Sequence, residues 1–314
     1  MIKVKNLCRK YDALFAVKDL NFTVKRGEVM GLLGPNGAGK STTMKMLTCF
    51  LPPSSGDASI GGLSLADSMK VRRLVGYLPE HAPSYHDLDV EAYLQFTGKM
   101  HGIPQGTRQD KIKEMASACG LDAVMFRRID ELSKGYRQRV GLAASMLHDP
   151  ECLILDEPTT GLDPNQIVEI RHLIRRLGEQ KTVLLSSHIL PEVEAVCDRM
   201  MIMDKGELQA LGTSAELSKQ AQGGVLVSAS IQGEIDRFST QLQSTLPDVE
   251  VLQQKAVEDG VTHIEIQHPD PECQLAQAVF YAAVASGAVL LEMRNERASL
   301  EDVFHKLTQG GQLS

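Results

Sequence analysis

The sequence predicts an α/β fold in which helices alternate with buried parallel strands, followed by a smaller α+β domain. Three features lead to this prediction. Continuous apolar runs at residues 28–33, 151–156 and 181–187 are typical of strands that are buried on both faces. Helical patterns fill residues 87–149, which indicates a helical subdomain inserted between two of these strands. From residue 225 onward the pattern changes to β-α-β-β-α-β.

The composition is that of an ordinary globular protein. The chain has 314 residues, of which 43% are hydrophobic and 23% are charged. Its net charge of −7 argues against nonspecific binding to nucleic acid. The six cysteines lack C-x-x-C spacing, which favours reduced thiols in a reducing compartment. The start of the chain does not resemble a signal peptide, and no apolar run approaches the roughly 20 residues that span a bilayer.

The remaining elements of the first 218 residues follow from local patterns. Alternating apolar and polar residues predict half-buried strands at 2–7 and 16–24. A helix begins after Asp89, which has the residue type of an N-cap. The other expected elements are short strands at 57–60 and 74–78, helices at 108–119 and 136–147, and a hairpin of strands 199–204 and 207–211.

The segment that follows the first apolar strand is glycine-rich and ends in Lys-Ser-Thr. It fits the phosphate-loop pattern G-x-x-x-x-G-K-[ST], which a chain of this length matches by chance with a probability of about 1%. Glycines let the backbone turn its N–H groups toward phosphates, and a following helix adds positive potential. Lys40 is expected to reach the β- and γ-phosphates and Ser41 to ligate Mg²⁺. The loop comprises Gly34, Pro35, Asn36, Gly37, Ala38, Gly39, Lys40, Ser41 and Thr42.

Two carboxylates end the second apolar strand. Asp156 is placed to hold Mg²⁺, because the carboxyl ends of parallel strands meet at one edge of a sheet. Glu157 is a candidate general base that accepts a proton from an attacking water. His188 follows the third apolar strand and is expected at the same edge.

The C-terminal part is predicted as a separate domain. Residues 219–224 are expected to form a linker, and residues 225–314 an accessory α+β domain of ferredoxin-like type. A final helix is expected to begin near Ser299, which has capping-box spacing to Asp302. Its apolar stripe consists of Leu300, Val303, Phe304 and Leu307.

These segments together resemble the ATP-binding subunits of ABC transporters over roughly residues 1 to 220. The phosphate loop matches the Walker A motif of that family, and residues 152–157 match its Walker B motif and catalytic glutamate. The signature motif is matched by Ser133, Lys134, Gly135 and Tyr136. Further matches are Asp163 to the D-loop, His188 to the switch histidine, and Tyr11 to the aromatic residue that stacks on adenine.

The resemblance implies the fold and the activity of that family. The fold is a P-loop NTPase of ABC ATPase type over residues 1–218, with its helical subdomain at about 81–149, and the chain is a Mg²⁺-dependent ATPase. In the family, two subunits enclose two ATP molecules, so that the signature of one chain meets the γ-phosphate bound by the other. The expected partners are a second ATPase subunit, identical or not, and a permease at the inner face of the membrane. Residues near 80–101 would form the groove for a permease helix.

This sequence departs from the family pattern at two places. The signature reads Leu-Ser-Lys-Gly-Tyr, so that its third and fifth positions differ, while Ser133 and Gly135 are kept. Glu80 stands where the family has a glutamine that ligates the metal, and its charge is expected to alter metal affinity. The segment Leu300–Phe304 resembles the tail of ATPases paired with ABC-2 type exporters.

Two other classes of protein share part of this pattern. Non-transport ABC-type ATPases act on DNA or ribosomes, but the DNA-repair members insert a long coiled coil between the Walker motifs. Here 116 positions separate Lys40 from Asp156, without sustained heptads. A nucleotide-binding regulator with little turnover is the other alternative, and Glu157 and His188 argue against it.

Overall fold

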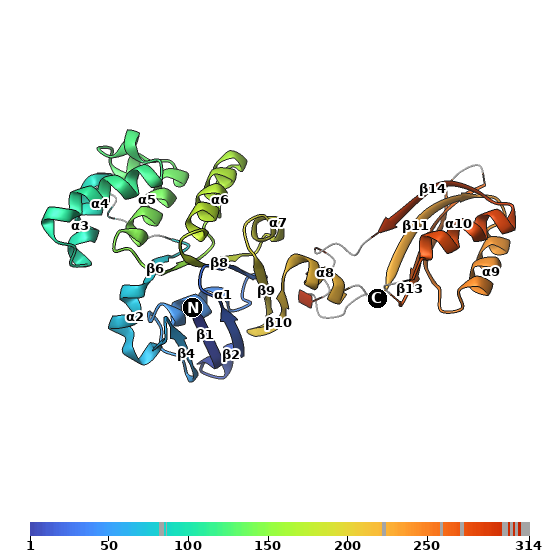
Figure 1. The fold of residues 1–314 in the computed structure, drawn as a ribbon, viewed down its shortest axis with the longest axis horizontal. Coiled ribbons are helices and arrows are strands. Elements are labelled where there is room, and N and C mark those ends of the chain that lie inside the picture. The colour runs from blue at the N-terminus through green and yellow to red at the C-terminus, as the bar shows by residue number, and fades with distance from the viewer. Residues whose placement is uncertain are drawn as a thin grey trace. The chain divides into compact units, whose positions relative to one another are not determined.

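The computed structural model describes residues 1–81, 85, 87–221, 224–257, 260–270 and 273–296, and the single positions 301, 304, 307 and 308. The chain divides into two compact units (Figure 1). The first is Met1–Ser214 with the C-terminal residues from Leu307, and the second is Ala215–Lys306. None of the described helices is long and apolar enough to cross a membrane.

A six-stranded sheet forms the centre of the first unit. Its strand order is β10-β9-β3-β8-β7-β6. All neighbouring strands are parallel except β9 and β10, which form the predicted hairpin around Lys205 and Gly206. The strands are β3 (Val29–Leu33), β6 (Val75–Leu78), β7 (Cys152–Leu155), β8 (Thr182–Ser187), β9 (Arg199–Asp204) and β10 (Glu207–Gly212). Every residue of β3, β7 and β8 is buried, as the continuous apolar runs predict.

A second, antiparallel sheet contributes to the same hydrophobic core. Its order is β2-β1-β4-β5. Along β1 the apolar Ile2 and Val4 are buried while Lys3 and Lys5 are exposed, which confirms the predicted half-buried strand. The strands are β1 (Ile2–Tyr11), β2 (Leu14–Val24), β4 (Ser55–Ile60) and β5 (Leu63–Ser64). Helix α1 (Lys40–Leu47) adds Met44 and Leu47 to the core.

The predicted helical subdomain lies between β6 and β7. Helix α3 (Val90–Met100) begins at Asp89, whose side chain accepts a hydrogen bond of 2.7 Å from the backbone N–H of Ala92. It is followed by α4 (Gln105–Ala118) and α5 (Lys134–Met146). Three further helices of the first unit lie outside the ranges predicted above: α2 (Ser68–Leu74), α6 (Pro164–Gly178) and α7 (Leu190–Glu194).

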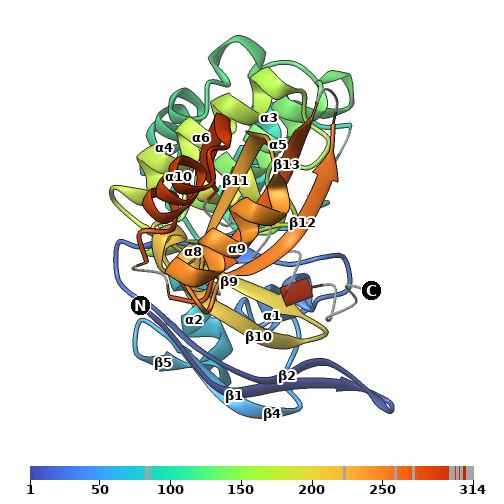
Figure 2. The same cartoon turned by 90° about the vertical axis from the view of Figure 1, so that its right-hand side faces the viewer.

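The second unit has the predicted split β-α-β arrangement. Its strand order is β12-β13-β11-β14, and the three neighbouring pairs are antiparallel. Helices α9 and α10 lie on the same face of this sheet (Figures 1 and 2). The elements are β11 (Val225–Gln232), α9 (Ile235–Thr245), β12 (Glu250–Ala256), β13 (Val261–His268), α10 (Leu275–Ser286) and β14 (Val289–Glu296).

Part of the segment expected as a linker is helical. Helix α8 (Ser214–Ala221) extends into the expected linker at 219–224, and the division between the units falls at Ser214 rather than at residue 218. The glycines that suggested a linker come only after this helix, whose Leu217 is fully buried. The capping residues Ser299 and Asp302 of the predicted final helix lie outside the described residues, as do Leu300 and Val303.

Candidate functional site

The predicted phosphate loop lines a cleft of about 510 Å³ at the carboxyl edge of the six-stranded sheet. The loop connects β3 to α1, as the motif requires. Glu80, Glu157 and His188 come from three other places in the chain and line the same cleft. The lining residues are Ala16, Pro35, Asn36, Gly37, Ala38, Gly39, Lys40, Ser41, Thr42, Glu80, Glu157, Thr160 and His188.

The loop glycines have backbone conformations that other residues rarely adopt. Gly37 has φ of 84° and Gly39 has φ of 99°, both in the left-handed region. A Cβ at Gly39 would lie 2.5 Å from the carbonyl oxygen of Ala16, so a side chain there is also excluded sterically. Around Gly37 the space within 4 Å is open. The backbone is therefore bare where a phosphate group approaches the first turn of α1, and the residues present fit a nucleoside triphosphate.

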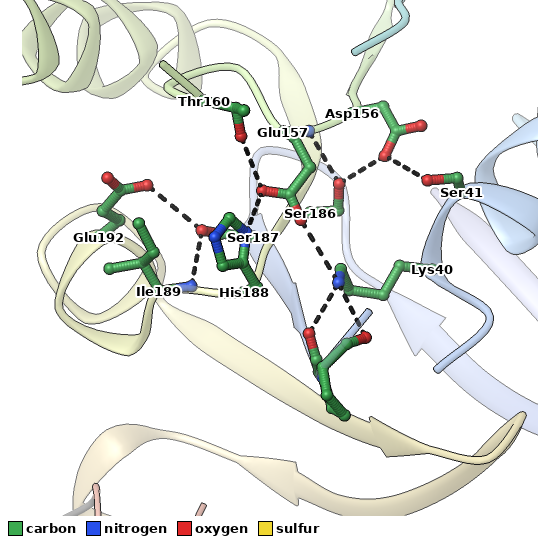
Figure 3. A network of polar contacts seen from close by, with 12 residues as sticks. Lys40, Ser41, Asp156, Glu157, Thr160, Ser186, Ser187, His188, Ile189 and Glu192 are labelled. Atoms are coloured by element: carbon green, nitrogen blue, oxygen red, sulfur yellow. Dashed lines mark hydrogen bonds and ion pairs between the residues drawn. The ribbon is translucent and has the colours of Figure 1, made fainter. Parts of the chain in front are cut away.

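Lys40 places a buried cation over this loop. Its Nζ donates hydrogen bonds to the carbonyl oxygens of Gly34 at 2.7 Å and Pro35 at 3.3 Å. The same atom lies 3.3 Å from Oε1 of Glu157 (Figure 3). Both side chains are less than a tenth exposed. The cation that is expected to bind phosphate and the candidate general base are thus in direct contact at one point of the cleft.

Asp156 connects the loop to the centre of the sheet through two hydroxyl groups. Its Oδ1 accepts hydrogen bonds from Ser41 Oγ at 3.1 Å and Ser186 Oγ at 2.7 Å (Figure 3). Burial raises the pKa of the Asp156 carboxyl, the two hydroxyl groups oppose this shift, and the charges of Glu157 and Glu80 add to it. Hydroxyl and carboxylate oxygens are the ligands that Mg²⁺ prefers. Ser41, Asp156 and Glu80 therefore fit a magnesium site, where the ion would neutralise phosphate charge.

We expect Asp156→Asn to stabilise the nucleotide-free protein at neutral pH while it abolishes Mg²⁺-dependent turnover. Asparagine keeps an oxygen that accepts the hydrogen bonds of both serines, and it removes a buried charge. Removal of this charge should raise the free energy of unfolding by about 1 kcal/mol. The pKa of the Asp156 carboxyl is higher in the folded protein than its ordinary value of 3.8. The wild-type protein therefore loses stability as the pH rises from 3.8 through the pKa of the folded state. The advantage of the variant should therefore be small near pH 4 and complete at pH 7.5, as measured by urea unfolding without metal.

Asp149→Asn is the matched control for this measurement. Asp149 is exposed, and its hydrogen bond from Lys181 lowers the pKa of its carboxyl. The sign is opposite here, because a lowered folded pKa gives stability at neutral pH that is lost as pH falls. Asp149→Asn should therefore leave the protein unchanged or slightly less stable at pH 7.5. If Asp156→Asn is less stable than the wild type at pH 7.5, burial of the charged Asp156 carboxylate does not destabilise the protein as we expect.

Glu157 is held by contacts with three side chains in a strained backbone position. Its φ is 48°, in the left-handed region that residues with side chains seldom occupy. Its Oε2 accepts a hydrogen bond from Thr160 Oγ1 at 3.1 Å and lies 2.8 Å from Nδ1 of His188, and its N–H donates to Ser186 Oγ at 2.9 Å. A carboxylate fixed in this way at a phosphate cleft has the position of a general base.

Several predicted site residues do not line the cleft. Tyr11 is 46% exposed at the end of β1, and the guanidinium of Arg9 lies 4.7 Å from its ring centroid. Gly34 contributes its carbonyl oxygen to Lys40 but does not border the cleft. Asp163 caps α6 by accepting a hydrogen bond of 2.9 Å from the N–H of Gln166.

The signature residues form the beginning of α5. Ser133 is the N-cap, and its Oγ accepts a hydrogen bond of 3.4 Å from the N–H of Tyr136. A Cβ at Gly135 would lie 2.7 Å from the side-chain amide of Gln166, so α5 and α6 touch at their first turns. The side chain of Lys134 lies against Gly161. These four residues are not among the described residues that line the cleft of their own chain.

Two polar residues and one small residue of the site were not predicted from the sequence. Ser186 bridges Asp156 and Glu157, Thr160 bonds to Glu157, and Ala16 approaches the loop from β2. The signal for Ser186 is the pair of serines that ends β8 directly before His188. Polar residues at the end of a fully apolar strand indicate the functional edge of the sheet.

Comparison with known proteins gives consistent matches. A family model described as ABC transporter matches residues 17–160. The chain is 34% identical over 307 residues to an uncharacterized ABC transporter ATP-binding protein of Bacillus subtilis, YxlF, a match that covers 98% of this chain and 99% of that protein. It is 32% identical over 310 residues to the linearmycin resistance ATP-binding protein LnrL of the same organism, with 98% of both chains covered. A solved structure of an ATP-binding subunit of an ABC transporter has a TM-score of 0.63 and 34% identity, and the match covers 70% of this chain and 92% of that one.

Proposed function

Because the chain belongs to the family of ABC transporter ATP-binding proteins, which bind and hydrolyse ATP, we propose that it supplies energy to an ABC-2 type exporter. The membrane-spanning permease would be a separate chain. One observation carries the proposal: the signature residues lie outside the cleft that holds the phosphate loop. In the proposed arrangement a second ATPase chain completes each ATP site, and ATP binding brings the two chains together.

The proposed reaction uses the side chains that meet in the cleft. Water attacks the γ-phosphorus, the bond to the β–γ bridging oxygen breaks, and Glu157 accepts the proton that the water loses. Lys40 leaves its contact with Glu157 and binds the phosphates, while His188, which lies 2.8 Å from Glu157, steadies the γ-phosphate. Ser41, Asp156 and Glu80 would hold Mg²⁺, which would neutralise charge on the phosphates.

The signature residues supply the other half of the proposed site. Ser133 and Gly135 lie at the N-terminus of a 13-residue helix, where backbone N–H groups and the helix dipole favour an anion. Lys134 adds a cation in the same turn. We propose that this turn binds the γ-phosphate of the ATP held by the partner chain, and that Tyr11 stacks on adenine in its own chain.

A second groove, of about 850 Å³, is proposed to receive the permease. It lies between the first sheet and the helical subdomain, and its lining includes Pro79, His81, Tyr93, Thr97 and His101. Two further lining residues, Tyr77 and His148, each carry a buried polar atom without a hydrogen-bond partner among the described residues. The relative named for linearmycin resistance supports an export function.

Recovery of the tagged full chain from gently solubilised membranes tests this function. We expect a permease with several membrane spans to be recovered with it, which would place the chain at the cytoplasmic face of a membrane. Recovery of ribosomes or DNA-repair proteins without any membrane protein would contradict the exporter and favour a non-transport ATPase. The ATPase activity would be the same in both cases.

A further inference from the structure

A buried carboxylate outside all the family motifs described above lies behind the catalytic pair. Glu192 is on α7, four positions after His188, and is only 6% exposed. Its Oε2 accepts a hydrogen bond from Thr159 Oγ1. The same atom accepts a hydrogen bond of 3.2 Å from Ser187 Oγ, which Figure 3 shows. A buried carboxylate is costly unless such donors satisfy it, so its presence requires an explanation.

The two donors belong to the loops that carry Glu157 and His188. Thr159 lies two positions after Glu157 and next to Thr160, which itself bonds to Glu157. Ser187 directly precedes His188, and its Oγ also accepts a hydrogen bond of 3.0 Å from the N–H of Ile189. Glu192 thus joins the loop after β7 to the loop after β8, at the place where their side chains meet.

The helix that carries Glu192 is fixed on the central sheet. Its Val193 is fully buried, and a Cβ at Gly31 of β3 would lie 2.1 Å from Val193 Cγ1. The helix therefore rests directly on the backbone of β3, and only glycine at that position permits this approach. Because α7 is packed tightly on β3, Glu192 has a fixed position. Its hydrogen bonds to Thr159 and Ser187 therefore restrict the movement of the two loops.

We propose that Glu192 is a positioning residue for ATP hydrolysis. Its carboxylate fixes Thr159 and Ser187, and through them the separation of Glu157 and His188. This inference rests on the roles proposed above for Glu157 and His188. Glu192 is not among the described residues that line the cleft, so its removal should lower turnover and leave ATP affinity nearly unchanged.

Steady-state ATPase kinetics of the full chain test the proposal. We expect Glu192→Ala to lower kcat on the order of 10- to 100-fold, as displacement of supporting groups does, with KM for ATP within about 2-fold. Glu192→Gln keeps an oxygen that accepts both hydroxyl hydrogen bonds and should recover most of kcat. Glu194→Ala, an exposed position on the same helix, is the matched control and should behave as the wild type.

Glu157→Gln, measured beside these variants, separates the two proposals. Loss of turnover in Glu157→Gln with normal turnover in Glu192→Ala would overturn the role of Glu192 alone. Wild-type turnover in Glu157→Gln would overturn both roles. A parallel fall of kcat and ATP affinity in a folded Glu192→Ala would also overturn the positioning role.

If Glu192→Ala does not fold, Thr159→Val and Ser187→Ala replace it. Each removes one hydrogen bond to Glu192 and should lower kcat at unchanged KM. Because both act through one carboxylate, the double variant should show a non-additive loss relative to the single variants. Normal turnover in both single variants would overturn the proposal.

Discussion

Glu157→Gln should lower kcat by about 10²- to 10⁴-fold, the contribution of a positioned general base, with little change in ATP affinity. The glutamine has nearly the same shape and can still accept the hydrogen bond from Thr160, but it cannot take a proton from water. Single-turnover kinetics at saturating MgATP would measure the chemical step directly.

Glu151→Gln is the matched control for this variant. Glu151 directly precedes the same strand, β7, and forms an exposed ion pair with Arg26 at 2.8 Å. An exposed pair of this kind contributes little, so turnover should stay at the wild-type rate. A Glu157→Gln variant that keeps more than about a tenth of the wild-type kcat would exclude Glu157 as the general base.

Lys40→Ala should abolish productive ATP binding. A charge-assisted hydrogen bond to phosphate contributes about 1.5–3 kcal/mol to the binding free energy. Its loss corresponds to a dissociation constant that is about 10- to 150-fold larger. Loss of a cation that stabilises developing charge lowers kcat by a further factor of about 10² to 10³. Equilibrium binding of a fluorescent ATP analogue and steady-state turnover measure the two effects separately.

Loss of Lys40 also leaves Glu157 without its buried cation, so the folded state needs its own check. Thermal unfolding without nucleotide shows whether the variant is folded at the assay temperature. Lys70→Ala is the control, because Lys70 is an exposed residue of α2 that forms an exposed ion pair with Asp67 at 3.7 Å. ATP affinity of Lys40→Ala within 3-fold of the control would contradict the assigned phosphate contact.

All the cleft residues except Ala16 and Thr160 could be predicted, because each lies in a short contiguous motif or directly after a strand. Residues 35–42 are adjacent in sequence, and Glu80, Glu157 and His188 each follow a strand of one parallel sheet. The carboxyl ends of parallel strands share one edge, so these residues had to come together whatever the order of the strands. The roles assigned to them stay predictions until the variants are measured.

The supporting residues could not be predicted, because they depend on the order of the strands. The sheet places β8 between β3 and β7, and only this order lets Ser186 reach both Asp156 and the N–H of Glu157. Glu192 depends in addition on the close approach of α7 to Gly31. Neither the order of the strands nor the packing of α7 on β3 can be read from the order of residues in the sequence. The second unit shows the same limit, since its element types were predicted but its strand register was not.

If ATP joins two chains into complete sites, the mass of Glu157→Gln in solution should depend on the bound nucleotide. The variant would be passed through size exclusion with light scattering at saturating MgATP and, separately, with ADP. A single chain has a mass of 34.4 kDa. We expect about twice this mass with ATP, the single-chain mass with ADP, and a weakened dimer when Ser133→Ala is added. A single-chain mass with ATP bound would contradict the joining of two chains by ATP.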